Sequence, residues 1–428
     1  MSTCKERAFD LLKRMSFERI AGSKEEYACA KILEEECKKA GIDVTIEEFE
    51  IDAPIIEKAV LKISKPFEME FNCIGIGKSG STLDEGIYAE VVYVENVMDA
   101  NLLDVKGKIA LVTGVEVDAR KRLIEYGAVG YILIHGSLFD SEEMISEIRT
   151  RNIRKKEDDV NLPGVVMHIV DAQKLLRLKP TEVCMILKQD ENHKETSHNV
   201  IATIPGTKKP DEIITFSAHY DSVIYSSGAW DNATGSVTIM ELMHYFNENK
   251  PDRTLKFIWC GSEEIGLIGS YSYCVSHIDE LKNVLFNINV DMTGTLLGYD
   301  IAVCSCEEAV SEYINFLGKL EGFAIKSRVD MYSSDSSSFA VHNIPAVTFA
   351  RISPRGGAEI HSRHDVLDHL DSDKFIDTVN FMAKFSKNLV NSKVFPVSKN
   401  LPKELNEKLD GYKKRFGMKN ENKKEEIK

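Results

Sequence analysis

The stretch TFSAHYDSVIYSSGAWDNATG, from Thr215 to Gly235, decides the fold. Its first residues continue the apolar run 213–216, which is typical of a buried parallel strand. Polar residues suited to metal binding follow this run, namely His219, Asp221 and Asp231. The next segment, 233–247, has apolar residues at helical spacing. A strand, a polar loop and a helix in this order predict an open α/β sheet, with its site beyond the carboxyl ends of the strands.

Three later apolar runs complete the pattern, at 254–260, 285–290 and 345–350. Each is short and rich in β-branched or aromatic residues, as expected for buried strands. Further metal-type ligands follow these runs, namely Glu263, Glu264, Asp291 and His361. Because the carboxyl ends of parallel strands meet at one edge of a sheet, we expect these side chains to converge with those after the first strand.

The composition is that of a soluble globular protein of two or three domains, with 428 residues and 43% hydrophobic residues. The net charge of −14 argues against a nucleic-acid partner, because binding phosphates requires a basic surface. Nine scattered cysteines, an odd number, favour reduced thiols. No stretch approaches about 18 apolar residues, and the N-terminal segment lacks the apolar core of a signal peptide. We therefore expect a cytoplasmic protein without a membrane span.

The texture of the sequence changes along the chain and predicts four segments. We expect 1–70 to begin the catalytic domain, 71–185 to be an inserted β-rich domain, 186–395 to hold the metal site and 396–428 to be a charged tail. Short strand-like runs mark the insertion, at 90–94, 109–112, 130–134 and 165–169.

Smaller features complete this outline. We expect a helix starting after Ser23, a polar linker at 188–197, an edge strand at 199–204 and a helix at 401–416, followed by a disordered end. His135 and His168 each stand alone among apolar neighbours, and we interpret both as structural residues.

The candidate ligands suit two metal ions. Two imidazoles and three carboxylates are more than one catalytic zinc uses, since it takes three protein ligands and a water. Two divalent ions that share one carboxylate would use all five, and Asp231 is the natural bridge. Asp221 is placed to accept the second ring N–H of His219. Mixed nitrogen and oxygen ligands favour Zn²⁺, with Mn²⁺ or Co²⁺ as substitutes.

The adjacent Glu263 and Glu264 require different roles, because neighbouring residues in a loop point in different directions. We assign Glu264 as a metal ligand and Glu263 as the general base that takes a proton from the metal-bridging water. Either pair, His-x-Asp or Glu-Glu, is weak by itself. The conjunction of all the motifs, in order and at strand ends, carries the prediction.

With these residues in hand, the chain resembles the co-catalytic dizinc peptidase family that includes bacterial secreted leucine aminopeptidases and glutamate carboxypeptidase. The motifs that carry the resemblance are His219-Tyr-Asp-Ser, Gly228-Ala-Trp-Asp-Asn-Ala-Thr-Gly, Glu263-Glu-Ile-Gly-Leu-Ile-Gly-Ser and Asn289-Val-Asp-Met. The resemblance implies a phosphorylase/hydrolase-like fold, in which a mixed, mostly parallel sheet is flanked by helices. It implies one zinc on His219, Asp231 and Asp291, and another on Asp231, Glu264 and His361.

The insertion resembles a protease-associated domain in the segments that begin at Asp104 and Tyr126. Two departures from the family pattern stand near the site. Ser336 occupies a position that is often His, and Ile360 one where some members have a tyrosine that steadies the oxyanion. Tyr332 is a candidate substitute for that tyrosine, and a packed loop aromatic is the equal alternative.

We therefore predict an aminopeptidase that hydrolyses peptides with a two-zinc-bridged hydroxide and Glu263 as base. A glutamate-releasing carboxypeptidase is the alternative; it would need arginines for the substrate carboxylate, and Arg351 and Arg355 are near the site in sequence. A glutaminyl cyclase would use one zinc, and a metal-free receptor on the same scaffold would lack ligands. The sequence leaves the oligomeric state open, including a homo-oligomer.

Overall fold

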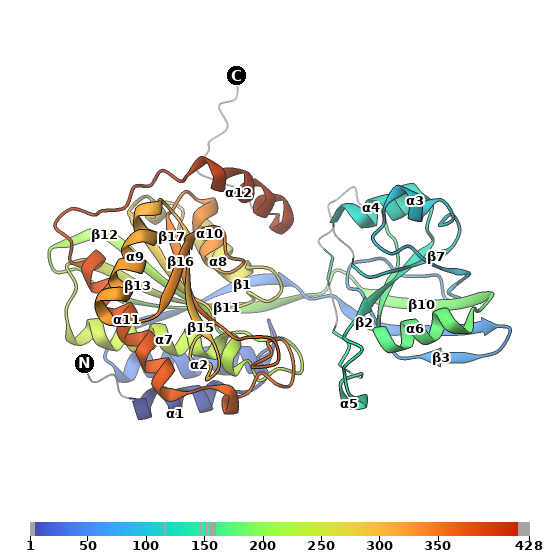
Figure 1. Cartoon of the computed structure of the whole chain (residues 1–428), viewed down its shortest axis with the longest axis horizontal. Coiled ribbons are helices and arrows are strands. Elements are labelled where there is room, and N and C mark those ends of the chain that lie inside the picture. The colour runs from blue at the N-terminus through green and yellow to red at the C-terminus, as the bar shows by residue number, and fades with distance from the viewer. Residues whose placement is uncertain (1–4, 115–116, 146, 150–151, 154–159, 418–428) are drawn as a thin grey trace, which may run out of the picture. The chain divides into compact units, whose positions relative to one another are not determined.

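A computed structural model describes residues 5–114, 117–145, 147–149, 152–153 and 160–417 of the chain (Figure 1). The chain divides into two compact units, one of Met1–Ile51 with Glu195–Lys428 and one of Asp52–Lys194. The second unit extends beyond the predicted bounds of 71 and 185. The reason is that β2 (Ile55–Lys65) and β10 (Glu182–Asp190) pair with each other as antiparallel strands.

The first unit contains an eight-stranded sheet in the order β1-β11-β13-β12-β14-β17-β15-β16. Its strands are β1 (Asp43–Asp52), β11 (Lys194–Ile204), β12 (Lys209–His219), β13 (Arg253–Cys260), β14 (Val284–Val290), β15 (Tyr299–Ser305), β16 (Ile325–Val329) and β17 (Ala346–Ile352). β12 runs parallel to β13 and β14, and β14 runs parallel to β17. β11 runs antiparallel to β13, and β15 runs antiparallel to β17. The predicted mixed, mostly parallel sheet is confirmed.

Two details of the strand prediction are wrong. Residues 199–204 are not an edge strand, because β1 lies outside β11 in the sheet. The polar segment 188–197 is not a linker, because β10 continues to Asp190 and β11 begins at Lys194. Both strands are longer than their apolar cores, so hydropathy alone ended them too early.

Helices cover both faces of this sheet. They are α1 (Lys5–Met15), α2 (Lys24–Lys39), η1 (Ala229–Ala233), α7 (Thr234–Glu248), α8 (Ile268–Ser276), η2 (Glu280–Lys282), α9 (Glu308–Glu321), α10 (Ser336–Val341), η3 (Leu367–His369), α11 (Ser372–Val390) and α12 (Lys403–Phe416). Alternate residues of β13 show the two layers. Phe257 and Trp259 join the core that includes α1, α2, α7 and α11. Ile258 and Cys260 join the core on the other face, with α8 and Phe339 of α10.

The second unit contains two sheets. One has the order β3-β2-β10-β5 and the other β4-β9-β8-β7-β6. The remaining strands are β3 (Met69–Phe71), β4 (Cys73–Gly75), β5 (Ile87–Ala89), β6 (Val91–Tyr93), β7 (Ile109–Val112), β8 (Gly130–His135) and β9 (Gly164–His168). Its helices are α3 (Asp99–Leu102), α4 (Val117–Glu125), α5 (Glu142–Ile145) and α6 (Ile169–Leu178). His168 caps α6 and lies 2.7 Å from Asp140, which is a structural arrangement.

The helix predictions at the two ends of the chain are confirmed. The hydroxyl of Ser23 accepts the N–H of Glu26 at the start of α2. α12 buries Leu405 and Leu409 in a cluster that includes Leu267 and Met331. The expectation for the last residues falls on 418–428, outside the described part of the chain.

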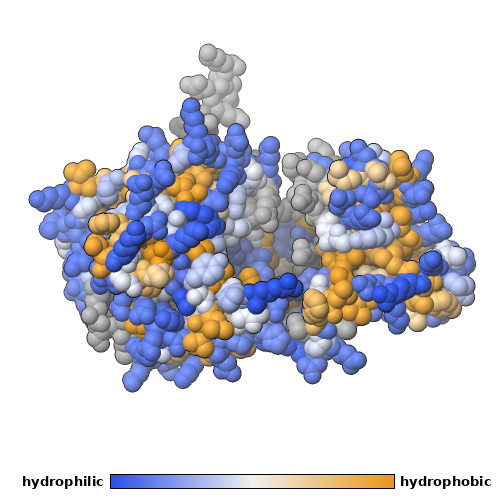
Figure 2. Space-filling model, viewed as in Figure 1, coloured by the Kyte–Doolittle hydropathy of each residue, from blue (hydrophilic) through white to orange (hydrophobic). Residues whose placement is uncertain are grey.

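Hydrophilic residues cover much of the face of the first unit that Figure 2 shows. The exposed large apolar side chains of the second unit include Leu83, Leu103 and Phe139. Within the described ranges, no helix combines the length and the hydropathy that crossing a membrane would require.

Candidate active site

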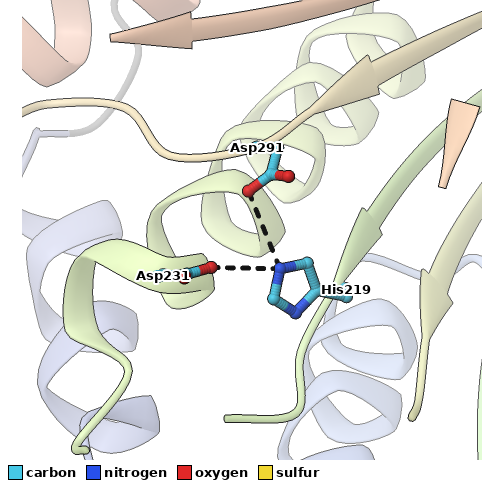
Figure 3. Close-up of side chains that lie close together, drawn as sticks. All are labelled: His219, Asp231 and Asp291. Carbon is cyan, nitrogen blue, oxygen red and sulfur yellow. Dashed lines mark ion pairs between the residues drawn. The ribbon is translucent and has the colours of Figure 1, made fainter. Parts of the chain in front are cut away.

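The predicted ligands of the first group come together at the carboxyl ends of β12 and β14. His219 is the last residue of β12, and Asp291 directly follows β14. Nε2 of His219 lies 3.2 Å from Oδ1 of Asp231 and 3.7 Å from Oδ1 of Asp291 (Figure 3). All three side chains are buried. Parallel pairing of β12 and β14 therefore places one imidazole between two carboxylates.

The second group forms around the other oxygen of Asp231. Nε2 of His361 lies 3.1 Å from Oδ2 of Asp231 and 3.0 Å from Oε2 of Glu264. The Nε2 atoms of His219 and His361 thus approach different oxygens of the Asp231 carboxylate. The ligand atoms of each group lie within 4.8 Å of one another, and Asp231 belongs to both groups.

Glu263 lies beside the first group. One of its carboxylate oxygens is 4.0 Å from Nε2 of His219. Asp221 holds the backbone of this loop, because its two oxygens accept the N–H groups of Glu263 and Glu264 at 3.0 and 3.1 Å. Its Oδ1 also lies 3.4 Å from Nδ1 of His219. Sequence reasoning anticipated the contact with the histidine but not the two backbone bonds.

The crowding of carboxylates changes the protonation of the site. Burial raises the pKa of Glu264 to about 7, and the charge of Asp231 contributes. Burial also raises the pKa of Glu263 well above its usual range, with help from Glu264. Burial opposes the charged form of His361, but Asp231 and Glu264 outweigh it and raise its pKa to about 10. The carboxylates of the cluster thus outnumber its two imidazoles, and without a metal ion the site has excess negative charge.

The donor set fits divalent metal ions. Oε1 of Glu264 and Oδ1 of Asp291 are buried without a hydrogen-bond partner among the described residues. Such oxygens are costly to bury unless a cation or a donor meets them. Imidazole nitrogen and carboxylate oxygen together are ligands of Zn²⁺. The site therefore has the chemistry of a zinc centre.

Two further residues support this site in roles that the sequence analysis did not assign. The amide of Asn232 accepts the N–H of Met292 at 3.0 Å and donates to the carbonyl of Val290 at 2.9 Å, so it fixes both neighbours of Asp291. Its carbonyl oxygen also accepts the N–H of Gly235 at 2.8 Å. The other residue is Asp365, which bonds the turn that carries Asp231.

The backbone around the ligands is strained in three places. Ser262, Met292 and His361 have φ values of 57°, 69° and 59°. Residues other than glycine rarely adopt this left-handed backbone conformation, and each instance costs about 1–3 kcal/mol. Strain of this kind is typical of sites where surrounding bonds fix a functional side chain.

Tyr332 lies within electrostatic range of the cluster. Burial raises its pKa, and the carboxylates of Asp291 and Asp231 add to the effect. Asp335, in the same segment, is fully buried, and neither of its carboxylate oxygens has a hydrogen-bond partner among the described residues. The hydroxyl of Ser336 lies 2.7 Å from the hydroxyl of Thr348.

Arg351 has a structural role. Its Nη1 lies 2.5 Å from Oδ2 of Asp300, and its Nε donates to the carbonyl of Thr295 at 2.7 Å. These bonds occupy the guanidinium within the sheet.

This chain thus combines an open α/β sheet with zinc-type ligands beyond the carboxyl ends of its central strands, where such sheets place their binding sites. Residues 199–386, which contain the whole ligand cluster, match the model of peptidase family M28. The family resemblance predicted from the motifs is confirmed.

Curated relatives agree with this match. The chain is 29% identical to aminopeptidase YwaD of Bacillus subtilis over 307 residues, which cover 70% of this chain and 61% of that protein. It is 28% identical to a probable leucine aminopeptidase 1 of Trichophyton verrucosum over 45% of this chain and 58% of the relative. It is 26% identical to carboxypeptidase Q of Pongo abelii over 55% and 53%. The chain thus spans about three fifths or less of the length of these relatives.

A solved structure supports the fold. BSAP, a zinc aminopeptidase from Bacillus subtilis, superimposes with a TM-score of 0.75. The sequence identity is 24%, and the match covers 91% of this chain and 96% of that structure. The fold is therefore shared along nearly the whole chain.

Proposed function

We propose that this chain is a metal-dependent aminopeptidase that removes amino-terminal residues from peptides. The bridging position of Asp231 carries this proposal, because its two oxygens lie 3.2 Å from His219 and 3.1 Å from His361. This geometry supports two divalent ions that share one carboxylate. His219, Asp231 and Asp291 would hold one ion, and Asp231, Glu264 and His361 the other.

The mechanism follows from the positions of the surrounding residues. When bound, the ions supply Lewis acidity, which polarises the scissile carbonyl and makes a water molecule acidic near neutral pH. Glu263 accepts the proton of that water and passes it to the leaving amine. Asp221 keeps Glu263 in place through its backbone N–H. The hydroxyl of Tyr332 is our candidate donor to the developing oxyanion.

The hydrogen bonds of Arg351 favour an aminopeptidase over a carboxypeptidase. A carboxypeptidase needs a cation for the terminal carboxylate of its substrate, and bidentate arginine is well suited to that task. Arg351 is committed to Asp300 and to a backbone carbonyl instead.

Two further proposals concern the rest of the chain. The Asp52–Lys194 unit is β-rich and carries the motifs that begin at Asp104 and Tyr126, which supports a protease-associated domain. The eight described cysteines are free thiols, which supports residence in the cytoplasm.

The test is amino-terminal release from unblocked and amino-blocked peptides by zinc-loaded, chelator-stripped and Glu263→Gln protein, with bound metal counted in each. We expect about two zinc ions per chain, and cleavage of unblocked peptides only. Activity should vanish on stripping and fall about 10²–10⁴-fold in the variant, while the variant keeps its metal. Release from the carboxyl end of amino-blocked peptides would support the carboxypeptidase instead. Full activity of the stripped protein would refute a metal-dependent mechanism.

A further inference from the structure

Asp365 is a buried carboxylate, four residues after His361, that bonds a different metal-ligand loop. Its Oδ1 accepts the N–H of Trp230 at 2.6 Å, and its Oδ2 accepts the N–H of Asp231 at 3.1 Å. The residue is 1% exposed. One side chain therefore connects the loop of His361 to the turn of Asp231.

The loop of His361 needs such a connection. The residues before it include Pro354, Gly356 and Gly357, and no helix or strand lies between β17 and η3. The His361 side chain is 39% exposed and its φ is 59°. His219, in contrast, ends a buried central strand. Its position is set by the sheet, whereas the position of His361 depends on contacts of its loop.

Backbone hydrogen bonds of Asp365 hold the short segment that follows His361. The N–H of Asp365 donates to the carbonyl of Ser362 at 3.1 Å, which closes a turn directly after His361. The hydroxyl of Ser227 donates to the backbone carbonyl of Asp365 at 2.5 Å. The carboxylate and the turn are thus one rigid link between His361 and Asp231.

The link is electrostatically expensive. The carboxylate of Asp365 is buried close to that of Asp231, and like charges repel strongly away from water. Arg19 offsets part of this cost; its guanidinium donates to the carbonyls of Ser227 and Gly228 at 2.7 and 2.9 Å. A neutral side chain could join two loops at lower cost, so a charged one in this place points to a role beyond holding loops together.

We infer that Asp365 is a positioning residue that sets the spacing of Asp231 and His361, and thereby the metal affinity of the group formed by Asp231, Glu264 and His361. The inference rests on the metal site of the proposed function. It predicts a selective effect. Metal binding at this group depends on Asp365, whereas the group that contains His219 and Asp291 depends on strands β12 and β14.

Zinc binding to the metal-stripped chain tests the inference without any substrate. In Asp365→Asn, the single amide oxygen can replace only one of the two carboxylate oxygens that accept the N–H groups of Trp230 and Asp231. The amide nitrogen, which is a donor, then faces the other N–H group. We expect one zinc to bind about 10–100-fold more weakly, measured by competition with a chromophoric chelator, and the other to keep its affinity. Asp371→Asn is the matched control, because the side chain of Asp371 caps α11 by accepting the N–H of Lys374. The backbone N–H of Asp371 donates to the carbonyl of Gly294, near Asp291, and the substitution leaves that bond in place.

A second control separates positioning from simple attachment of the loops. Ser227→Ala removes the hydroxyl that bonds the Asp365 backbone and leaves the carboxylate in place. Its zinc affinity should fall less than that of Asp365→Asn, because the two N–H bonds to the carboxylate remain. An equal loss in Ser227→Ala and Asp365→Asn would overturn the inference, since attachment alone would then explain the effect.

The unfolding temperature of the metal-free proteins completes the test. We expect metal-free Asp365→Asn to be folded and to gain less stability from zinc than the wild type does. If Asp365→Asn and Asp365→Glu are both unfolded without metal, Asp365 supports the fold and the inference fails. If Asp365→Asn binds both ions with wild-type affinity, only this inference fails. A wild-type chain that binds no zinc would refute the proposed function as well.

Discussion

Oδ1 of Asp221 accepts a hydrogen bond of 3.0 Å from the backbone N–H of Glu263. The other oxygen of Asp221 accepts the N–H of Glu264. A residue in the loop after β12 therefore determines the course of the loop after β13. Because the proposed base and a proposed ligand are neighbours in that loop, Asp221 orients both with one carboxylate.

Asp221→Asn should reduce catalysis without unfolding the protein. The amide retains the size of the carboxylate but presents an N–H₂ group to one of the two backbone donors. We expect kcat/KM for an unblocked peptide to fall about 10–100-fold. Asp84→Asn, an exposed carboxylate near Lys188, should leave it unchanged. Wild-type kinetics in Asp221→Asn would show that the two backbone bonds do not orient the base.

Gly235→Ala should destabilise the turn that carries Asp231. A Cβ at this position would lie 2.3 Å from Oδ1 of Asn232 and 2.5 Å from the carbonyl of Val290. Crowding of this kind costs about 1–3 kcal/mol, and chemical denaturation of the metal-free protein can measure it. The comparison is Gly411→Ala within α12, where nothing lies within 4 Å of the added Cβ. That change should stabilise the helix by up to about 1 kcal/mol. Equal stabilities would contradict the close packing at Gly235.

Tyr332→Phe tests the proposed oxyanion donor. Removal of one such donor lowers kcat about 10²–10³-fold, so we expect a decrease of this size with unchanged zinc content and little change in KM. Tyr299→Phe, on a side chain that is 56% exposed, serves as the control. Unchanged kcat in Tyr332→Phe would leave Tyr332 as a packed loop aromatic.

Glu26→Gln should remove a pH dependence of stability. Burial raises the pKa of Glu26 to about 8 from an ordinary value of 4.5. The folded protein therefore holds the proton more tightly, so the stabilisation is complete below pH 4.5 and is lost as the pH rises through about 8. Across this window, the free energy of unfolding of the wild type should fall relative to the variant by up to about 1.4 kcal/mol per pH unit.

Urea denaturation at several pH values between 4.5 and 8 measures this difference. Glu25→Gln is the control, because the Glu25 side chain is 46% exposed in the same helical turn. Its profile should parallel that of the wild type. A Glu26→Gln profile that also parallels the wild type would contradict a protonated, buried Glu26.

The central sheet and the five clustered ligands could be predicted from the sequence. Each ligand follows an apolar run, and parallel strands bring their carboxyl ends to one edge, so sequence order was enough to place His219 near Asp291. The domain bounds could not be predicted in the same way. β2 and β10 pair across more than a hundred residues of intervening chain, and the mostly exposed or half-buried pattern of β2 resembles that of other surface strands.

The supporting residues were beyond sequence reasoning for a different reason. Asn232 and Asp365 act on backbone N–H and carbonyl groups, and every residue except proline offers both of these groups. No residue type in the partner position reveals such a bond. The two backbone bonds of Asp221 escaped prediction for the same reason, although its contact with His219 did not.

The helix α12 is synthesised after all the proposed metal ligands, although it packs behind one of the loops that carry them. Its Leu405 and Leu409 pack in a cluster with Leu267 and Met331, which lie three residues after Glu264 and one before Tyr332. During translation, the ligand-bearing strands leave the ribosome well before residues 403–416 do. Leu405 and Leu409 therefore complete this apolar cluster only after the last described helix has emerged. A nascent chain would hold most of its metal ligands before the hydrophobic support behind one of their loops is in place.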